Sequence, residues 1–480
     1  MLKEQITKLK NEPNQENFFE LLARLQDSTV WIPCTAVMGE EDQKALEKMV
    51  KASDDPQDMV GQEFTSSGAI RLVPDILQDS EGHFFFPVFT SPSEMGEYGD
   101  HFSKIEKHFL EALGLAANNA KNVAGIVFNA FTDPYVLDRQ LFGLVEDMHQ
   151  DGSRRMFVGA VLGLAVADAI GVPYEFRQRK DIARDPANDM TGYGTHGQPA
   201  GTWSDDTSMT LALIDALTKS GAEPNYGLLA DNFAAWLDRA EFTAHGEVFD
   251  VGGTCLRAIG KHVRQPELEP WECGDKSPEA CGNGGLMRIL PMVFWLCAKY
   301  GGRFIDVPEA REELRKVTAV THANACCCLA NLIYVCFAGM LFCRMAPADA
   351  WEYTTGKIRE IAAADPWLKT ALPLFGRLLS EDFLKTPAKK LSGSGYVVHT
   401  LESAVWCLMS TADYRSCVLA AVNLGEDTDT TAAVAGGLAG LYYAGSDKGI
   451  PESWLAALAK RDEILAMCEG LWESMVSKQW

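Results

Sequence analysis

The sequence predicts a multi-domain protein: a small α+β domain over residues 1–150, followed by an all-helical domain over residues 151–480. The 480 residues exceed the length of most single domains, and 47% hydrophobic with 23% charged residues is typical of a soluble globular protein. Before residue 150, short β-type runs alternate with helical stretches. After it, alanine, leucine and glycine recur at helical spacing, which favours a helical domain.

The first domain contains three runs that are typical of strands. We predict strands at Val30–Pro33, His83–Phe89 and Val123–Phe128, where aromatic and β-branched residues gather. Ser91–Glu94 has the pattern of a capped helix start. The turn-forming residues Asp151–Ser153 then predict a short linker to the second domain.

The second domain contains an apolar stretch from Cys326 to Cys343 in which Asn331 is the one clearly polar residue. It is slightly shorter than the ~20 residues that usually span a bilayer. It also contains Gly339 and lies among other strongly apolar stretches. We interpret it as the buried central helix of a helical domain, since such a helix is apolar on all sides. No membrane association is therefore expected.

The charge balance restricts the classes of partner. The chain has 43 basic and 66 acidic residues, which gives a net charge of −23. Binding to nucleic acid or to an anionic membrane rests on lysine and arginine, so both partners are disfavoured. An acidic protein of this kind fits cation binding or a basic protein partner instead.

The cysteines indicate free thiols in a reducing compartment. Their number, 13, is odd, and Cys326, Cys327 and Cys328 are consecutive, although neighbouring cysteines pair poorly. Buried thiols of this kind are typical of proteins that stay in a reducing environment. The N-terminal residues lack the apolar core of a signal peptide, so we expect a cytoplasmic protein.

Two acidic clusters, Ser204–Thr207 and Asp427–Thr431, carry most of the functional information. Each leads directly into an alanine-rich helical stretch, Met209–Leu217 in one case and Ala432–Tyr443 in the other. One Asp, Ser or Thr suffices to cap a helix, and four neighbouring carboxylates repel one another unless a cation lies between them. Hard divalent cations prefer such oxygen ligands. The pattern predicts a site for two Mg²⁺ or Mn²⁺ ions.

If the two clusters share one site, their aspartates must meet in space. Ligands of one ion lie within about 2–2.6 Å of it, so we expect Asp206 and Asp429 within roughly 10 Å of each other. Taken alone, the paired aspartates would also suit a metal-dependent phosphoesterase. They would equally suit ordinary caps on solvated helix ends.

Further motifs accompany the aspartates in a fixed order. They are Gly159–Gly171, Pro173–Phe176, Gly201–Thr207, Phe249–Gly252, Gly282–Arg288, Thr321–His322, Ser394–Val398 and Asn423–Thr430. On these motifs the chain from Phe157 to about Gly445 resembles the ADP-ribosylglycohydrolase family, helical hydrolases typified by the dinitrogenase-reductase-activating glycohydrolase. The resemblance implies an enzyme that removes ADP-ribose from modified protein side chains, with arginine-linked ADP-ribose favoured. It argues against the phosphoesterase.

The resemblance and the chemistry together suggest roles for individual residues. The expected metal ligands are Ser204, Asp205, Asp206, Asp427, Asp429 and Thr430. Glu175 and Asp250 are the catalytic candidates, Glu175 from a flexible loop and Asp250 beside the scissile bond. The substrate-binding candidates are Gly282, Asn283, Gly284, His322 and Tyr396. The glycines would present N–H groups to a diphosphate, His322 would donate to a phosphate or ribose, and Tyr396 would stack on adenine.

Each of these candidates also has a purely structural interpretation. Glu175 precedes basic residues and could form a surface ion pair, and Asp250 could close a turn. His322 could be a capped core histidine, and Tyr396 could be an ordinary exposed loop residue. Asn283 and its glycines could form a simple turn.

Four positions depart from the family pattern. Ala167 stands where glycine is usual, and Ser204 where threonine is commoner. Gly285 replaces a serine and so removes a hydroxyl from the loop expected to face the ligand. Glu426 replaces a second glycine and adds a negative charge beside the proposed metal. The metal carboxylates survive all four changes, so we expect effects on substrate identity more than on hydrolysis.

The N-terminal part, over about residues 20–140, resembles the SseB-type N-terminal domain. The matching segments are Leu21–Ala23, Trp31–Pro33, Phe86–Ser91 and Gly125–Phe131. The resemblance implies no catalysis, so we expect a partner-binding domain or one that stabilises its neighbour. An alternative function follows: an immunity or binding protein that neutralises an ADP-ribosyltransferase toxin, with or without catalysis.

Overall fold

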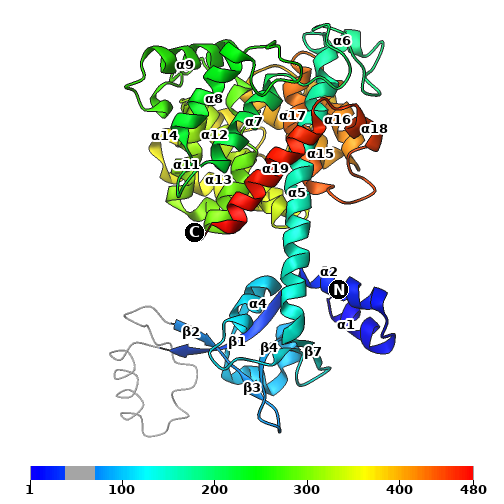
Figure 1. Cartoon of the computed structure of the whole chain (residues 1–480). Helices are drawn as coiled ribbons and strands as arrows, with labels where there is room; N and C mark the ends of the chain where they lie inside the picture. Colours follow the sequence, from blue (N-terminus) through cyan, green and yellow to red (C-terminus); the bar gives the residue numbers. More distant parts are fainter. Residues whose placement is uncertain (1, 38–70, 479–480) are drawn as a thin grey trace. The chain divides into compact units, whose positions relative to one another are not determined.

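The computed structural model describes residues 2–37 and 71–478 and divides the chain into two compact units (Figure 1). Unit 1 is Met1–Gly152 and unit 2 is Ser153–Trp480. Unit 1 mixes strands and helices, whereas unit 2 is mostly helical. The two-part architecture expected from the sequence is therefore confirmed.

Unit 1 is built from short elements. Its helices and strands are α1 (Leu2–Asn11), α2 (Gln15–Leu25), β1 (Thr29–Val37), β2 (Arg71–Pro74), β3 (Leu77–Gln78), β4 (Phe84–Val88), the 3₁₀ helix η2 (Pro92–His101), β5 (Ser103–His108), α4 (Phe109–Ala117), β6 (Gly125–Phe128), β7 (Tyr135–Asp138) and the 3₁₀ helix η3 (Arg139–Leu141). The three strands expected from the sequence correspond to β1, β4 and β6. The strands among the described residues form two sheets, with strand orders β2-β1-β5 and β3-β4-β6-β7.

The two sheets of unit 1 meet at one point. Trp31 and Phe89 exchange backbone hydrogen bonds of 2.8 and 2.9 Å. Within the second sheet β4 and β6 are parallel, and β6 packs against α4. The start of η2 differs from the expected cap: Ser91 Oγ contacts Ser93 Oγ at 2.8 Å and caps no backbone N–H.

Unit 2 surrounds a core of aliphatic and aromatic side chains. Its α-helices are α5 (Phe142–Gly171, which starts in unit 1), α6 (Arg179–Ile182), α7 (Asp205–Thr218), α8 (Tyr226–Arg239), α9 (Gly253–Arg264), α10 (Pro291–Tyr300), α11 (Pro308–Ala319), α12 (Ala325–Phe342), α13 (Pro347–Ala364), α14 (Pro366–Ala371), α15 (Val397–Ser410), α16 (Tyr414–Val422), α17 (Thr428–Tyr442), α18 (Glu452–Ala457) and α19 (Arg461–Ser477). The two alanine-rich stretches after the acidic clusters are α7 and α17.

The boundary expected at Asp151–Ser153 coincides with the division between the two units, but these residues lie inside the continuous helix α5 and form no turn. Gly152 and Ser153 are buried, so their small side chains serve packing rather than a turn. Apolar residues at helical spacing on both sides of them favour continuation of the helix.

The apolar stretch after Cys326 forms α12, which is buried along nearly its whole length, as expected of a central helix. Two helical segments are long and apolar enough to span a membrane, Arg139–Tyr174 and Ala325–Phe342. Their most apolar windows are 83% and 89% buried inside the protein. Burial to this degree is what the core helices of a globular domain show.

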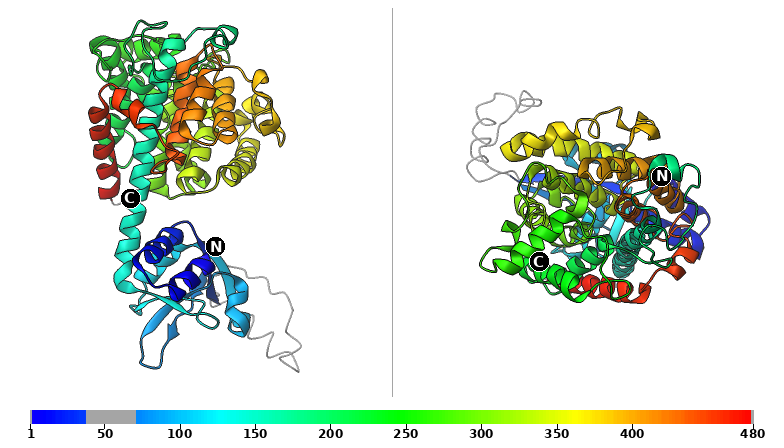
Figure 2. Two further views of the ribbon diagram at one scale, coloured as in Figure 1. Left: turned by 90° about the vertical axis from the view of Figure 1, so that its right-hand side faces the viewer. Right: turned by 90° about the horizontal axis from the view of Figure 1, so that it is seen from above.

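Helices α5 and α17 lie side by side (Figure 2) and touch through glycine. A Cβ atom added to Gly163 would lie 2.5 Å from the carbonyl oxygen of Gly436, and one added to Gly171 would lie 2.3 Å from Cα of Asp429. Thr428 Oγ1 donates to the Gly171 carbonyl at 2.8 Å. Only glycine permits this approach, which sets the first turn of α17 against the last turn of α5.

Replacing Gly171 by alanine should therefore destabilise the fold, by about 1–3 kcal/mol or more, because backbone atoms of α17 must move. Gly356 in α13 is the matched control: it is helical and exposed, and nothing lies within 4 Å of an added Cβ. Gly356→Ala should raise the free energy of unfolding by about 0.5–1 kcal/mol. Urea denaturation measures both values. Equal stabilities for the two variants would contradict the close approach.

Candidate active site

The start of α7 is held by a carboxylate from α5. Asp168 is fully buried and accepts hydrogen bonds from the backbone N–H groups of Ser204, at 2.9 and 3.0 Å, and Thr207, at 3.1 Å. The Thr207 hydroxyl donates to the same carboxylate at 2.6 Å. Asp168 therefore caps α7, and the following aspartates are free for another purpose.

The start of α17 is different, because its first carboxylate caps nothing. Asp427 occupies the N-cap position, but its side chain makes no capping hydrogen bond to a backbone N–H of the helix. Its Oδ2 atom accepts from the Asn283 side chain at 2.9 Å instead. Thr430 Oγ1 donates to Asp206 Oδ2 at 3.2 Å, which joins α17 to α7. The capping interpretation therefore fails for Asp427.

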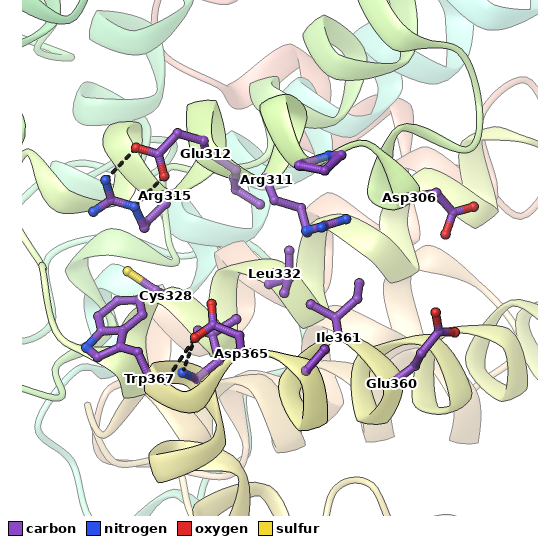
Figure 3. A pocket seen from close by; sticks show the side chains of 14 residues that line it. Asp306, Arg311, Glu312, Arg315, Cys328, Leu332, Glu360, Ile361, Asp365 and Trp367 are labelled. Carbon is purple, nitrogen blue, oxygen red and sulfur yellow. Dashed lines mark hydrogen bonds and ion pairs between the residues drawn. The ribbon is translucent and has the colours of Figure 1, made fainter.

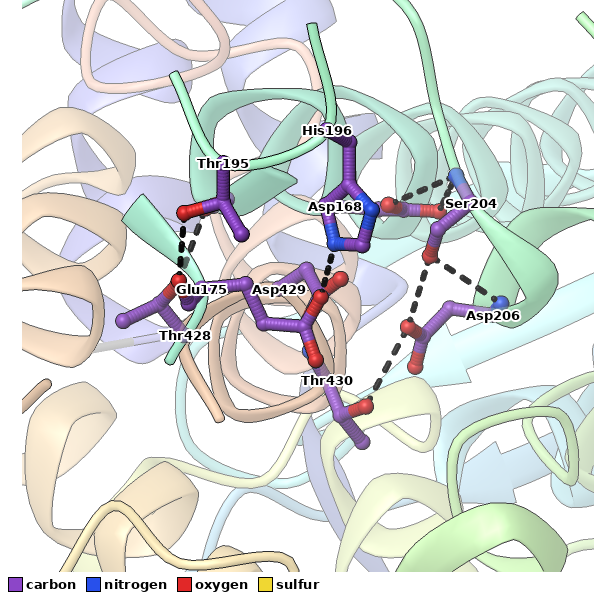
Figure 4. A network of polar contacts seen from close by, with 10 residues as sticks. Asp168, Glu175, Thr195, His196, Ser204, Asp206, Thr428, Asp429 and Thr430 are labelled. Carbon is purple, nitrogen blue, oxygen red and sulfur yellow. Dashed lines mark hydrogen bonds and ion pairs between the residues drawn. The ribbon is translucent and has the colours of Figure 1, made fainter. Parts of the chain in front are cut away.

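The two acidic clusters meet at the junction of α5, α7 and α17 (Figure 4). One oxygen each of Asp168, Asp206 and Asp429 lie within 4.8 Å of one another. Asp429 also belongs to a second group with Glu175 and His196, within the same distance. The proximity of Asp206 and Asp429 that the sequence required is therefore present.

A loop before α7 brings Glu175 to the same centre. Thr195 Oγ1 donates to the Glu175 carbonyl at 2.6 Å, and His196 Nε2 hydrogen-bonds the Glu175 carboxylate. Glu175 is only 3% exposed, so the alternative of a surface ion pair is wrong. Figure 4 shows Glu175 and Asp429 side by side beneath His196.

The carboxylates at this centre resist ionisation. Burial, followed by mutual repulsion, raises the pKa values of Asp205, Asp206 and Asp429 well above their ordinary range. Burial raises the pKa of Asp168 to about 6 and that of Glu175 to about 7. Repulsion from Asp250 contributes to the raised pKa of Glu175, so the Asp250 carboxylate faces the same centre.

Several oxygens of the cluster have no hydrogen-bond donor within the described protein. They are Asp206 Oδ1, Asp427 Oδ1 and Asp429 Oδ2, all buried. A buried carboxylate oxygen without a donor is unfavourable, and oxygen-only sets with several negative charges are what Mg²⁺ and Mn²⁺ prefer. The donor set therefore fits divalent cations.

The glycine-rich motif after Cys281 forms the 3₁₀ turn η6 (Asn283–Gly285) at the edge of this centre. The Asn283 side chain donates to Thr400 Oγ1 at 3.0 Å as well as to Asp427. Its backbone N–H donates to the Gly395 carbonyl at 3.1 Å, and Gly282 forms a bridge to Tyr396. The structure thus brings the candidates Gly282, Asn283, Gly284 and Tyr396 together beside Asp427.

His322 lies beneath this turn. It is 1% exposed, and its ring lies 3.1 Å from the position of a Cβ added to Gly284. The Nδ1 atom of His322 forms a 2.9 Å hydrogen bond with Thr321 Oγ1. Burial lowers the pKa of His322 to about 3. The neutral, buried ring supports the turn, whereas direct contact with a ligand stays a prediction. The Tyr396 ring is half-buried and packs edge-on against His399.

A separate cavity of about 420 Å³ lies between α11, α12, α13 and α14 (Figure 3). Its charged side chains are largely engaged with one another or with the helices: Arg315 pairs with Glu312, and Asp365 caps α14. Its floor is apolar and includes Leu332 and Ile361. The clustered carboxylates of α5, α7 and α17 do not line it, so we place the chemistry at the carboxylate centre.

Comparison with known proteins identifies the family. Residues 149–479 match the ADP-ribosylglycohydrolase family. The chain belongs to the ADP-ribosylglycohydrolase family, and it is a glycohydrolase. Residues 2–141 match the SseB protein N-terminal domain, in agreement with the resemblance drawn from the sequence.

Individual relatives support the assignment. The chain is 29% identical to the ADP-ribosylarginine hydrolase Tri1 of Pseudomonas putida (strain GB-1), over 66% of this chain and 77% of the relative. It is 30% identical to the ADP-ribosyl-[dinitrogen reductase] glycohydrolase of Rhodospirillum rubrum, over 64% of this chain and 91% of the relative. A solved ADP-ribosylglycohydrolase-related protein complex matches with a TM-score of 0.54 and 28% identity, over 68% of this chain and 99% of that chain.

Two residues of this glycohydrolase site were not predicted from the sequence. Asp168 is the single carboxylate within the apolar stretch Gly159–Gly171, and a lone buried charge is a signal that could have identified it. His196 lies in a glycine-containing loop that carries no comparable pattern. Its contact with Glu175 depends on how that loop folds back.

The departures from the family pattern have visible structural effects. Glu426 replaces a glycine yet keeps a positive φ of 66°, held by backbone hydrogen bonds to Phe176 and Arg177. Its neighbour Phe176 also has a positive φ, 62°. Strained backbone of this kind concentrates at functional sites. At Gly285 an added Cβ would lie 3.4 Å from His322 Cβ, so the position could hold the usual serine in ordinary van der Waals contact with that residue.

The metal-free enzyme should lose stability as pH rises from about 5 to 8. Folded-state pKa values of about 6 for Asp168 and about 7 for Glu175 exceed the unfolded values near 4, so the folded state binds more protons within this window. Melting temperatures in EDTA across this range measure the effect. Asp206→Asn should flatten the dependence, whereas Asp447→Asn, at an exposed position, should not. If the melting temperature of the metal-free enzyme rose with pH instead, the interpretation that the buried carboxylates repel one another would be wrong.

Proposed function

We propose that this glycohydrolase removes ADP-ribose from modified arginine side chains of proteins, with two Mg²⁺ or Mn²⁺ ions held by the carboxylates of α7 and α17. Two of the relatives support this proposal, because their names describe hydrolysis of ADP-ribosylarginine and of ADP-ribosylated dinitrogen reductase. The buried cluster of Asp206 and Asp429 supports the metal requirement. The observation that carries the arginine preference is a row of aromatic rings beside Asp250.

This row consists of Phe176, His196 and Phe249. The His196 ring centre lies 5.9 Å from that of Phe176 and 5.2 Å from that of Phe249. Asp250 follows Phe249 directly and holds a positive φ of 50°, next to the carboxylate centre. A guanidinium stacks on aromatic rings and pairs with carboxylates, so this wall suits an arginine leaving group. A serine hydroxyl would gain little from it.

Residues of the chain also account for the proton chemistry. Hydrolysis needs a group that takes a proton from the attacking water, and a leaving group that departs in a stabilised form. With a pKa of about 7, Glu175 is partly ionised at neutral pH and can accept that proton on its carboxylate. Asp250 can hold the departing guanidinium. Divalent cations bound in such a centre lower the pKa of water and orient ribose hydroxyls.

Asp206→Asn and Asp429→Asn should each reduce metal-dependent release of ADP-ribose by about 1,000-fold or more, because a metal centre contributes several kcal/mol of charge stabilisation. The rise in melting temperature caused by Mn²⁺ should shrink in both variants, since binding to the native state stabilises it by mass action. The exposed control Asp447→Asn should behave like the parent. Undiminished activity in both site variants would refute the proposal.

The parent should hydrolyse ADP-ribosyl-arginine in preference to ADP-ribosyl-serine and modified nucleic acid. Phe249→Leu should lower kcat/KM for the arginine linkage about 2- to 30-fold, since a cation–π contact contributes about 0.5–2 kcal/mol. Its activity on the serine linkage should change little. Tyr442→Leu, at an exposed aromatic near the end of α17, is the control. Faster release from serine than from arginine by the parent would overturn the arginine assignment.

Neutralisation of an ADP-ribosyltransferase toxin by binding stays the second candidate. It is favoured by exposed apolar side chains on unit 1, where Phe131 is 51% and Val136 45% exposed. Exposed apolar groups of this kind are common at protein interfaces. A parent that is inactive on every linkage yet binds a transferase tightly would support this function in place of hydrolysis.

A further inference from the structure

The segment that leads into the substrate turn η6 is attached to the first turn of α12 through Asn324. The Asn324 side chain accepts from the Cys327 backbone N–H at 2.9 Å and donates to the Ala280 carbonyl at 2.8 Å. Cys281, the residue between Ala280 and the glycine motif, is half-buried. The cysteines at the start of α12 therefore lie directly against the segment that leads into η6.

The thiols of Cys281 and Cys327 lie next to each other. Cys327 Sγ lies 3.6 Å from the carbonyl oxygen of Ala280 and 3.5 Å from that of Gly282, the residues on either side of Cys281. Cys281 Sγ lies 3.8 Å from Asn324 Oδ1, the atom that binds the Cys327 N–H. The Cys327 thiol is within hydrogen-bonding range of the Cys281 sulfur.

The other two thiols of the run are placed differently, although the Cys326 thiol also lies within hydrogen-bonding range of the Cys281 sulfur. Cys326 Sγ lies 4.0 Å from the Tyr396 hydroxyl. Cys328 faces the opposite side of α12, where it lines the cavity with Leu332 (Figure 3). Consecutive residues of a helix project about 100° apart, so Cys328 faces away from Cys281, and of the other two thiols Cys327 is the one that lies against the carbonyls on either side of Cys281.

The thiols also differ in reactivity. Hydrogen bonds from Cys327 and, to a smaller extent, Cys326 lower the pKa of Cys281 to about 6, which favours its thiolate, while its Sγ also lies 3.0 Å from the Pro278 carbonyl oxygen. Burial raises the pKa of Cys328 to about 12 and keeps that thiol protonated. Thiolates react with peroxides and thiols do not, so oxidation should be selective for Cys281.

We propose that Cys281 is an oxidation site for hydroperoxides and that Cys327 resolves it to a reversible disulfide, which displaces the substrate turn η6. The proposal concerns the loop that carries the substrate-binding candidates, and it holds for any ADP-ribosyl linkage.

The reaction balances with a hydroperoxide as oxidant. The Cys281 thiolate attacks one peroxide oxygen; an S–O bond forms, the O–O bond breaks, and hydroxide or alkoxide leaves and takes up a proton. The Cys327 sulfur then attacks the sulfenic acid. The S–S bond forms, the S–O bond breaks, and the proton of Cys327 leaves with the departing oxygen as water. A dithiol reverses the reaction by exchange.

Disulfide formation would pull the segment before η6 toward α12, because the two sulfurs, which are free thiols here, must approach to about 2.05 Å. The Cys281 carbonyl accepts from the Val397 N–H at 2.9 Å, and Asn283 is bonded to Gly395 and to Asp427. A shift of Cys281 toward α12 therefore disturbs the contacts that place Asn283 beside the carboxylate centre. Misplacement of a substrate-binding group by about 1 Å can cost up to 100-fold, so we expect at least tenfold weaker binding of ADP-ribose.

The test treats the full-length parent with a small excess of hydrogen peroxide in Mg²⁺ buffer, blocks remaining thiols by alkylation and maps the peptides by mass spectrometry. We expect a Cys281–Cys327 disulfide that dithiothreitol reverses, with a matching reversible loss of ADP-ribose affinity by calorimetry. Affinity for ADP-ribose is measured directly, so the result does not depend on which linkage is hydrolysed.

Two variants complete the experiment. Cys281→Ser should bind ADP-ribose like the parent and should no longer respond to peroxide. The matched control Cys328→Ser changes a buried thiol one residue beyond Cys327 and should keep the full response. Mapping also detects a bond between Cys297 and Cys343, which lie at the other end of α12. A response that persists in Cys281→Ser, a parent without the Cys281–Cys327 disulfide, or an oxidised parent with unchanged affinity would overturn the proposal.

Discussion

Repulsion between buried carboxylates is the constraint on which the rest of unit 2 depends. Asp206 and Asp429 are fully buried, and their pKa values are raised by burial and by further carboxylates around them. Without a compensating positive charge, such a cluster favours movement of the helices away from one another or protonation of the carboxylates. The fold must therefore hold the helices in place against this repulsion. It does so mainly through backbone contacts, which cannot relax by rotation of a side chain.

Close glycine contacts and hydrogen bonds hold the helices in place against the carboxylate repulsion. The contact of Gly163 with Gly436 brings α5 and α17 to backbone distance, and Asp168 holds the first turn of α7 with both of its oxygens. The first turns of α7 and α17 add partial positive charge at their N-termini, which favours nearby carboxylates. These effects position the aspartates without neutralising them, so the remaining negative charge is available to bind cations.

The helix starts and their aspartates could be predicted from the sequence because capping residues and apolar periodicity are local signals. The meeting of Asp206 and Asp429 followed from the chemical requirement for shared ligands. Three further features depend on tertiary contacts, which these local signals do not specify. The contact of His196 with Glu175 depends on a loop that returns over the site, the role of Asp168 depends on the crossing of α5 and α7, and the continuity of α5 through Gly152 depends on burial.

We propose that the carboxylate cluster of α7 and α17 holds divalent cations. Anomalous diffraction from crystals of the full chain grown with Mn²⁺ would show whether ions bind there. The account predicts anomalous peaks between the carboxylates of Asp206 and Asp429, at about 2.0–2.6 Å from their oxygens. Crystals in which Mn²⁺ binds elsewhere, or in which these carboxylates hold only hydrogen-bonded water at saturating Mn²⁺, would contradict it.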